Sequence, residues 1–247
     1  MLTFLRRVSF GAIVVCTIFT NIAVAAPKQA PVGSLNSQIV GVPMQIIVLL
    51  TALTILPAIV MSLTPFLRIV VVLHFLRQAL GTQTVPSNQV LAGLSLFLTC
   101  LLIQPLAAEV YTSAWIPFEA QQLTMNEAFE KASKPIRVYL SHFVREKDVE
   151  LFLKASATPA PQNKDNLPLI VLAPAYVLSE LKTSFQIGAI LFIPFLIVDV
   201  VVASLTVSIG MVQLPPVMIS APFKILLFIL VDGWNLVIGS LLASFRN

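Results

Sequence analysis

Charged side chains are scarce in this chain of 247 residues, of which only 11% are charged while 57% are hydrophobic. The mean hydropathy is +0.94, far above the range of soluble globular domains. The composition therefore excludes an ordinary soluble domain and indicates a protein of the membrane.

Signatures of the common enzyme classes are also absent. The sequence contains no GxxxxGK[ST] phosphate loop, no GxGxxG, no HExxH and no GxSxG motif. The two histidines, His74 and His142, have no cluster of cysteines or carboxylates at metal-ligand spacing. We therefore expect a protein that is not an enzyme, with no catalytic residue, no cofactor and no metal site.

The first 25 residues have the pattern of a secretory signal peptide. Arg6 and Arg7 form a positive start, residues 8–24 an apolar stretch, and Ala23-Val24-Ala25 a small-residue cleavage site. We expect cleavage between Ala25 and Ala26, which places the mature N-terminus outside the cytoplasm. An uncleaved first membrane helix is the alternative interpretation.

The number of cysteines and the net charge argue against a disulfide-bonded fold and against a nucleic-acid-binding protein. Cys16 lies in the leader, so Cys100 alone would remain after cleavage and could form no intrachain disulfide. The formal net charge of +4 includes Arg6 and Arg7, so the mature chain would carry 4 − 2 = +2. This bias is too weak to indicate a nucleic-acid partner.

Two long apolar runs, residues 185–211 and 217–245, make up the last third of the chain and are joined at Pro215-Pro216. Each is long enough to cross a bilayer, which takes about 20 helical residues. If the elbow folds the runs antiparallel, residue 199 pairs in depth with roughly residue 230.

These runs contain Asp199, Lys224 and Asp232. An ionisable group at the centre of an inserted helix costs roughly 2.5–3.5 kcal/mol. We therefore expect a buried charge network in which Asp199 contacts Lys224, within one subunit or between neighbours, with Glu180 joining them and Asp232 nearby. Snorkelling of Lys224 to water is the alternative.

A first pair of apolar segments spans residues 43–63 and 89–108, with a helix between them. Thr64 is expected to cap this helix, Pro65 to occupy its first position and Gly81 to end it. The helix is amphipathic, yet its charges Arg68 and Arg77 project from opposite sides, which indicates burial against a partner.

The middle of the chain is rich in charges of both signs and is expected to be a water-exposed, mostly helical insertion. Residues 124–127 match a capping box, and Asp148 is expected to cap a short helix. The predicted fold class is therefore all-α: two helical hairpins of a membrane-associated subunit, separated by this insertion. The predicted segments are the signal peptide 1–25, a flexible tail 26–42, the first hairpin 43–109, the polar insertion and linker 110–168, and the second hairpin 169–247.

The physics leaves two functional classes open. In a channel or translocon subunit the buried charges would hold subunits together, whereas in an ion-coupled carrier they would move ions. A carrier favours internal repeats, and none is visible in the sequence. Four crossings are also few for a carrier that acts alone, so a pore built by oligomerisation fits better.

Six blocks of sequence follow one another in an order that resembles one known family. They are 62–68 (SLTPFLR), 75–81 (FLRQALG), 86–90 (PSNQV), 174–188 (PAYVLSELKTSFQIG), 192–199 (FIPFLIVD) and 221–234 (APFKILLFILVDGW). Together they resemble the FliP family of the flagellar type III export gate, from about residue 43 to the C-terminus. The leader also resembles the flagellar branch, because relatives in virulence injectisomes (SctR type) generally start without a signal peptide.

The resemblance implies a core subunit that forms a pentamer with FliQ and FliR, beside FlhB and FlhA, in the inner membrane at the flagellar basal body. This assembly forms a ring or helical pore through which unfolded flagellar subunits pass. Two alternatives stay open: an ion-coupled carrier, and the corresponding subunit of an injectisome. The family's complex is a cone raised largely out of the membrane plane, which would account for charges in apolar helices.

The resemblance also implies a gate in the turn at residues 210–216. Family members often carry a run of methionines there, which converge on the pore axis as a gasket. Here the positions are Met211, Val212 and Gln213. Methionine suits a seal because it is flexible and apolar, so Gln213 is expected either to turn away or to make the ring leakier. A plain hairpin connection is the alternative.

Overall fold

The computed structural model describes residues 41–82, 84–156, 167–210 and 215–246, and these ranges contain helices and no strands. The predicted all-α fold class is confirmed. The helices are α2 (Gly41–Ser62), α3 (Phe66–Ala79), α4 (Asn88–Val110), the π-helical turn η1 (Tyr111–Trp115), α5 (Ile116–Glu119), α6 (Met125–Phe143), α7 (Glu146–Ala155), α8 (Leu169–Ser208), α9 (Pro216–Leu230) and α10 (Gly233–Ala243).

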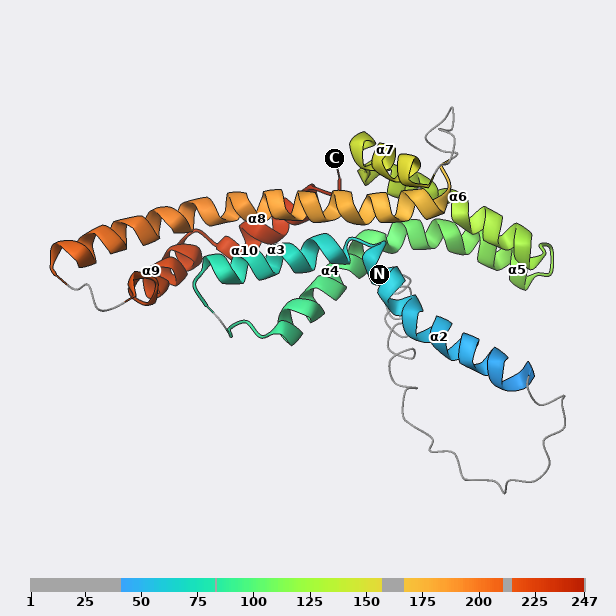
Figure 1. Ribbon diagram of the computed structural model, residues 1–247, viewed down its shortest axis with the longest axis horizontal. Helices are drawn as coiled ribbons and strands as arrows, with labels where there is room; N and C mark the ends of the chain where they lie inside the picture. Colours follow the sequence, from blue (N-terminus) through green and yellow to red (C-terminus); the bar gives the residue numbers. More distant parts are fainter. Residues whose placement is uncertain (1–40, 83, 157–166, 211–214, 247) are drawn as a thin grey trace, which may run out of the picture. The chain divides into compact units, whose positions relative to one another are not determined.

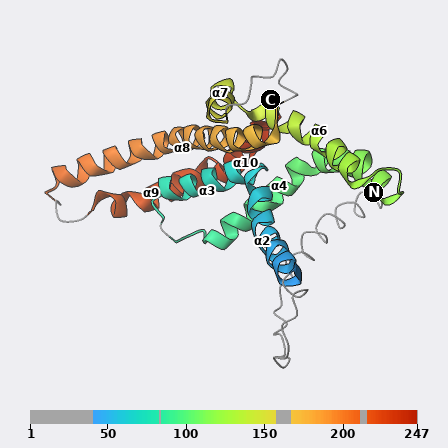
Figure 2. The same cartoon turned by 45° about the vertical axis from the view of Figure 1, so that its right-hand side comes forward.

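The chain divides into two units, one ending at Leu56 and the other beginning at Pro57. The described part of the first unit is the start of α2, whose leucine, isoleucine and valine side chains are exposed. In the second unit, α3 and α9 both lie against the long helix α8 (Figures 1 and 2), and α4 packs on α3.

The described residues of the second unit form two apolar clusters that meet different stretches of α8. One lies at the contact of α3 with α4, α8, α9 and α10 and includes Leu73, Leu76 and Phe195. The other joins α6 to the start of α8 and is built around Leu140, Leu172 and Tyr176. The clusters fix α3 and α6 against α8, and this placement brings distant charged residues together.

Among the residues that the structure describes, two helices are long and apolar enough to cross a membrane, the continuous segment Asn88–Glu119 and α8. Two further pairs, α2 with α3 and α9 with α10, meet the same criteria only when each bent pair counts as one span. Large apolar side chains remain exposed along the second half of α8 and along α9. Exposed apolar surface of this extent is typical of contact with lipid or with other subunits.

Some of the helix ends predicted from local sequence are confirmed, and others are wrong. The capping box of Thr124 and Glu127 is confirmed, and Gly81 follows the end of α3 with a φ of +75° that favours glycine. The expectation for Thr64 is wrong: its hydroxyl donates to the Met61 carbonyl, and Pro65 is the N-cap. Asp148 does not cap α7, because its carboxylate accepts from Arg145 and Ser179 instead.

The second apolar hairpin contains a break that was not predicted. The expected single run 217–245 is broken between α9 and α10, which are bent by 67° relative to one another. The break falls at Asp232, whose φ of +51° is left-handed. A Cβ atom at the following residue, Gly233, would overlap the ring of Phe228, so the bend depends on glycine at this position.

Gly188 lies on α8 where the Phe75 side chain of α3 packs closely against it. A Cβ atom at this position would lie 2.5 Å from Cδ2 of Phe75, whose ring also packs edge-on against Phe185. We expect Gly188→Ala to lower the free energy of unfolding by about 1–3 kcal/mol through overpacking. Thermal unfolding of the detergent-solubilised protein measures this loss.

The matched control for this substitution is Gly93→Ala on α4, because no atom lies within 4 Å of the added methyl group. Alanine favours a helix over glycine by up to about 1 kcal/mol, so this control should be neutral or stabilising. Equal melting temperatures for the two variants would contradict the packing described for α3 and α8.

Candidate functional site

The most deeply buried ion pair joins α3 to α8. Nε of Arg68 donates to Oε2 of Glu180 at 2.7 Å, and the terminal nitrogen NH2 donates to Oε1 at 2.5 Å. The exposed fractions of the two side chains are 5% and 0%. This two-pronged geometry is the strong arrangement of arginine with a carboxylate, so it compensates much of the cost of burying both charges.

The rest of the Arg68 guanidinium contacts residues near the C-terminus and the last residue of α6. NH1 of Arg68 donates to the carbonyl and the hydroxyl of Ser244, each at 3.1 Å. The guanidinium lies 4.0 Å from the ring centroid of Phe245 and 5.5 Å from that of Phe143. Arg68 therefore connects α3, α6, α8 and the residues after α10 through one side chain.

A second ion pair joins α8 to α9. Nζ of Lys224 donates to Oδ2 of Asp199 at 2.6 Å, and the hydroxyl of Ser220 donates to the other carboxylate oxygen at 2.5 Å. The lysine side chain is 4% exposed and the aspartate side chain 27%. Lys224 also donates to the carbonyl of Ala79 at 3.1 Å, so a cation meets the C-terminal end of α3, where the helix dipole favours positive charge.

The contact between Asp199 and Lys224 lies within one chain, and its register differs from the predicted one. The prediction placed residue 230 at the depth of residue 199, whereas Ser220 and Lys224 occupy that place. Helix α8 ends at Ser208, before the Pro215-Pro216 elbow on which the prediction was centred. The midpoint of the hairpin therefore lies earlier in the sequence.

Glu180 does not join this second pair. It precedes Asp199 by 19 residues on the same helix, which corresponds to about 28 Å at 1.5 Å per residue. Its partner is Arg68. The predicted single network is therefore two separate pairs, which we call the Arg68 pair and the Lys224 pair.

Asp232 lies apart from both pairs. Its side chain is exposed at the break between α9 and α10, and it accepts a hydrogen bond of 3.2 Å from Asn235. The expectation that Asp232 is buried is wrong for the single chain, because the left-handed turn carries the residue out of the helical path.

Arg77 joins the end of α3 to the start of α4. Its terminal nitrogen NH1 donates to Oδ1 of Asn88 at 2.7 Å and to the carbonyl of Pro86 at 3.2 Å. The two arginines that were predicted to project from opposite sides of this helix thus contact different parts of the same chain.

Two groups of predicted residues lie outside the described part of the structure. They are the cleavage residues Ala25 and Ala26 and the gate-loop residues Met211, Val212 and Gln213. The flanks of the gate loop are described: Gly210 follows the end of α8 with a φ of +78°, and Pro215 precedes α9.

Sequence reasoning missed the polar partners that complete the two pairs. Ser220 precedes Lys224 by four residues, so the two share one helix face, and this spacing was a usable signal. No such signal was available for Ser244 and Phe245. Ser244, for example, contacts Arg68 across a separation of 176 residues in the sequence. Within the described ranges, no group of three or more histidine, cysteine, aspartate or glutamate residues could hold a metal ion.

The fold and these contacts define an all-helical membrane protein whose apolar helices are joined by two buried ion pairs. Residues 49–241 match the FliP family, so this chain belongs to the FliP family, as the sequence blocks indicated. Several curated relatives are named flagellar biosynthetic protein FliP.

The relatives come from distant bacteria. The protein of Pectobacterium carotovorum is 50% identical over 203 residues, which cover 82% of this chain and 79% of the relative. That of Bacillus subtilis is 47% identical over 213 residues, or 86% of this chain and 96% of the relative. That of Borreliella burgdorferi is 38% identical over 215 residues, or 86% and 85%. The likeness therefore covers most of the chain rather than one motif.

Proposed function

We propose that this chain is the core pore-forming subunit of the bacterial flagellar type III export gate and is required for flagellum assembly. The observation that carries the proposal is the family match over residues 49–241, with relatives named flagellar biosynthetic protein FliP. Its site is the inner membrane at the flagellar basal body. The chain is structural and conductive in this proposal and catalyses no reaction.

The proposed partners are further copies of this chain in a pentamer, FliQ, FliR, FlhB and FlhA, with unfolded flagellar subunits as cargo. The apolar side chains exposed along the second half of α8 and along α9 support such an assembly, because lipid or neighbouring subunits must cover them. Both ion pairs form within the single chain. In this proposal they hold each subunit in shape and leave the apolar faces free to associate.

The predicted segments extend the proposal. The leader 1–25 is cleaved after Ala25, and the tail 26–42 with the insertion 110–168 lies outside the cytoplasm. The hairpins 43–109 and 169–247 build the pore, with residues 211–213 as its gate. The described flanks support a tight turn at the gate, because Gly210 has a left-handed φ and Pro215-Pro216 cannot continue α8.

The gate is tested by deleting residues 211–213. We expect membranes that carry the complex to become more permeable to small ions and solutes, because Met211 and Val212 supply the apolar seal. The measurement is ion and dye leakage from liposomes that contain the purified complex. Unchanged leakage with an intact complex would show that the seal lies elsewhere.

The matched control removes three residues from another connection, residues 121–123 between α5 and α6, and should leave leakage unchanged. Export is read in parallel as secreted flagellin in a strain that lacks the gene and carries the variant. The alternative of an ion-coupled carrier predicts ion uptake by the chain without its partners. The injectisome alternative predicts normal flagella in the gene-deleted strain.

A further inference from the structure

The break between α9 and α10 places one carboxylate on an exposed apolar surface. Asp232 stands at this break with a φ of +51°, and its exposed side chain accepts a hydrogen bond of 3.2 Å from the amide of Asn235. This side chain does not cap α10 by accepting from its backbone. Within the described ranges, no basic side chain forms an ion pair with it. The carboxylate is therefore available to a group from outside the chain.

Large apolar side chains flank Asp232 on both sides in the sequence. Leu230, Val231 and Leu236 are each more than half exposed. Water around this surface would leave the apolar side chains uncovered, whereas hydrocarbon around it would bury the carboxylate at high cost. A protein surface that is apolar around one cation is favourable for both kinds of group.

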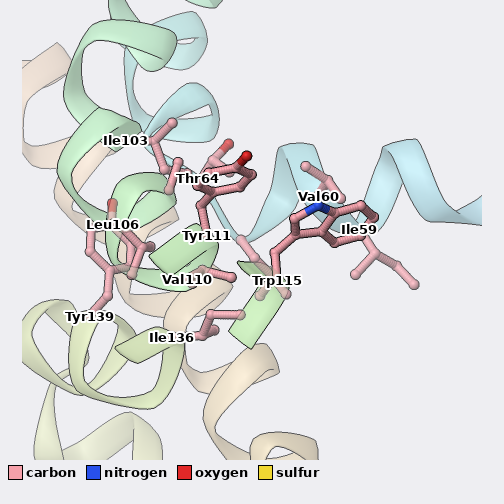
Figure 3. A pocket seen from close by; sticks show the side chains of 12 residues that line it. Ile59, Val60, Thr64, Ile103, Leu106, Val110, Tyr111, Trp115, Ile136 and Tyr139 are labelled. Carbon is pink, nitrogen blue, oxygen red and sulfur yellow. The ribbon is translucent and has the colours of Figure 1, made fainter. Parts of the chain in front are cut away.

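The charge at Asp232 distinguishes this surface from another exposed apolar region of the second unit. An apolar pocket between the end of α2, α4, η1 and α6 (Figure 3) has no charged side chain among its described lining residues, which include Trp115 and Ile136. Many apolar groups would fit that pocket, so it specifies no partner. At the break between α9 and α10 the carboxylate specifies a cation, because burial of an unpaired charge is strongly unfavourable.

Most basic side chains on the described apolar helices of this chain already have partners. Arg68 and Lys224 form the two buried pairs, and Arg77 donates to Asn88. None of these three could pair with Asp232 of a second copy without breaking a contact within its own chain.

Lys182, the exposed basic residue of α8, lies at a different level from Asp232. Helices α9 and α10 run antiparallel to α8 from the Lys224 pair to the Arg68 pair, so Asp232 lies beside roughly residue 191 of α8. Lys182 is then about 14 Å away along the helix axis at 1.5 Å per residue, which is further than a lysine side chain reaches. Copies of the chain arranged at one level therefore do not bring these two charges together.

We propose that the break between α9 and α10 binds a helix of a partner protein other than this chain, and that an arginine or lysine of this helix pairs with Asp232. The inference rests on the proposed function, in which the chain works in an assembly with other helical proteins. The partner's helix is apolar around its basic side chain, because it covers Leu230, Val231 and Leu236 beside the carboxylate. The two surfaces are then complementary in charge as well as in hydrophobicity.

Asp232→Asn tests the charge without changing the turn. Asparagine tolerates the left-handed backbone conformation and keeps an oxygen that accepts from Asn235. Because Asp232 is exposed in the single chain, the melting temperature of the variant should match that of the parent. The measurement is the mass of the intact complex, purified in mild detergent, over a dilution series. We expect the copies of this chain to stay together, whereas the affinity for one partner protein falls at least about tenfold.

Asn235→Ala and Lys182→Ala are the matched controls. The first removes the hydrogen bond to Asp232 and keeps the carboxylate, and the second removes an exposed charge from α8. Both variants should bind the partner as the parent does. The reciprocal variant Asp232→Lys should repel the partner's basic side chain, and exchange of that one basic residue for aspartate should restore binding.

Three results would overturn this proposal and leave the proposed function intact. Binding of the partner by Asp232→Asn as by the parent would show that the carboxylate faces water in the complex. Separation of the copies of this chain in both Asp232→Asn and Lys182→Ala would show that a second copy supplies the cation. Failure of every such exchange in the partner to restore binding to Asp232→Lys would exclude a direct ion pair. A parent chain recovered without any partner protein would instead contradict the proposed function, and this inference with it.

Discussion

Glu180→Ala should lower the free energy of unfolding by about 3–5 kcal/mol, because it leaves the buried guanidinium of Arg68 without its carboxylate. Without this charge partner, Arg68 is also expected to lose its contacts with Ser244 and Phe245. We expect little folded protein in the membrane and no assembled complex. Thermal unfolding in detergent and the yield of complex measure both effects.

The matched control is Glu150→Ala, which removes a carboxylate from the surface pair with Lys154, whose side chain is 75% exposed. Exposed pairs contribute little to stability, so this variant should behave as the parent. The double variant Arg68→Met with Glu180→Leu removes both charges and should recover most of the lost stability. Equal stability of Glu180→Ala and Glu150→Ala would contradict the role given to the Arg68 pair.

Asp199→Ala should reduce assembly more strongly than Lys224→Ala. The first change leaves a buried ammonium that still donates to the Ala79 carbonyl, whereas the second leaves a carboxylate that is 27% exposed and still accepts from Ser220. We expect Asp199→Ala to lower the free energy of unfolding by a few kcal/mol, and Lys224→Ala to lower it by less. The fraction of chain in the purified complex gives the order.

The charge exchange, Asp199→Lys with Lys224→Asp, separates the ion pair from other effects. It should recover part of the assembly lost in the single variants, because the two opposite charges again face one another. Lys182→Ala, a change at an exposed position of the same helix α8, is the control and should leave assembly intact. Wild-type assembly in both single variants would remove the Lys224 pair from the account.

Local signals in the sequence were sufficient for several elements. The capping box at Thr124 and Glu127 and the end of α3 at Gly81 depend on neighbours within a few residues, which a sequence displays directly. The cost of burying a charge also indicated that Asp199 and Lys224 needed partners.

Tertiary contacts account for what could not be predicted. Arg68 and Glu180 are separated by 112 residues, and only the packing of α3 on α8 brings them together. The bend at Asp232 was hidden in an unbroken apolar run, although Asp-Gly is a common turn dipeptide. The polar contacts of Ser220 and Ser244 likewise depend on helix positions that hydropathy does not specify.

The mass of the intact complex, measured after purification in mild detergent, distinguishes a subunit of the export gate from a carrier that acts alone. A subunit of the flagellar export gate should be recovered as a large assembly with several copies of this chain and small helical partner proteins. The exposed apolar surfaces of α8 and α9 should be covered in that assembly. A stable monomer that transports an ion when placed alone in liposomes would contradict the account.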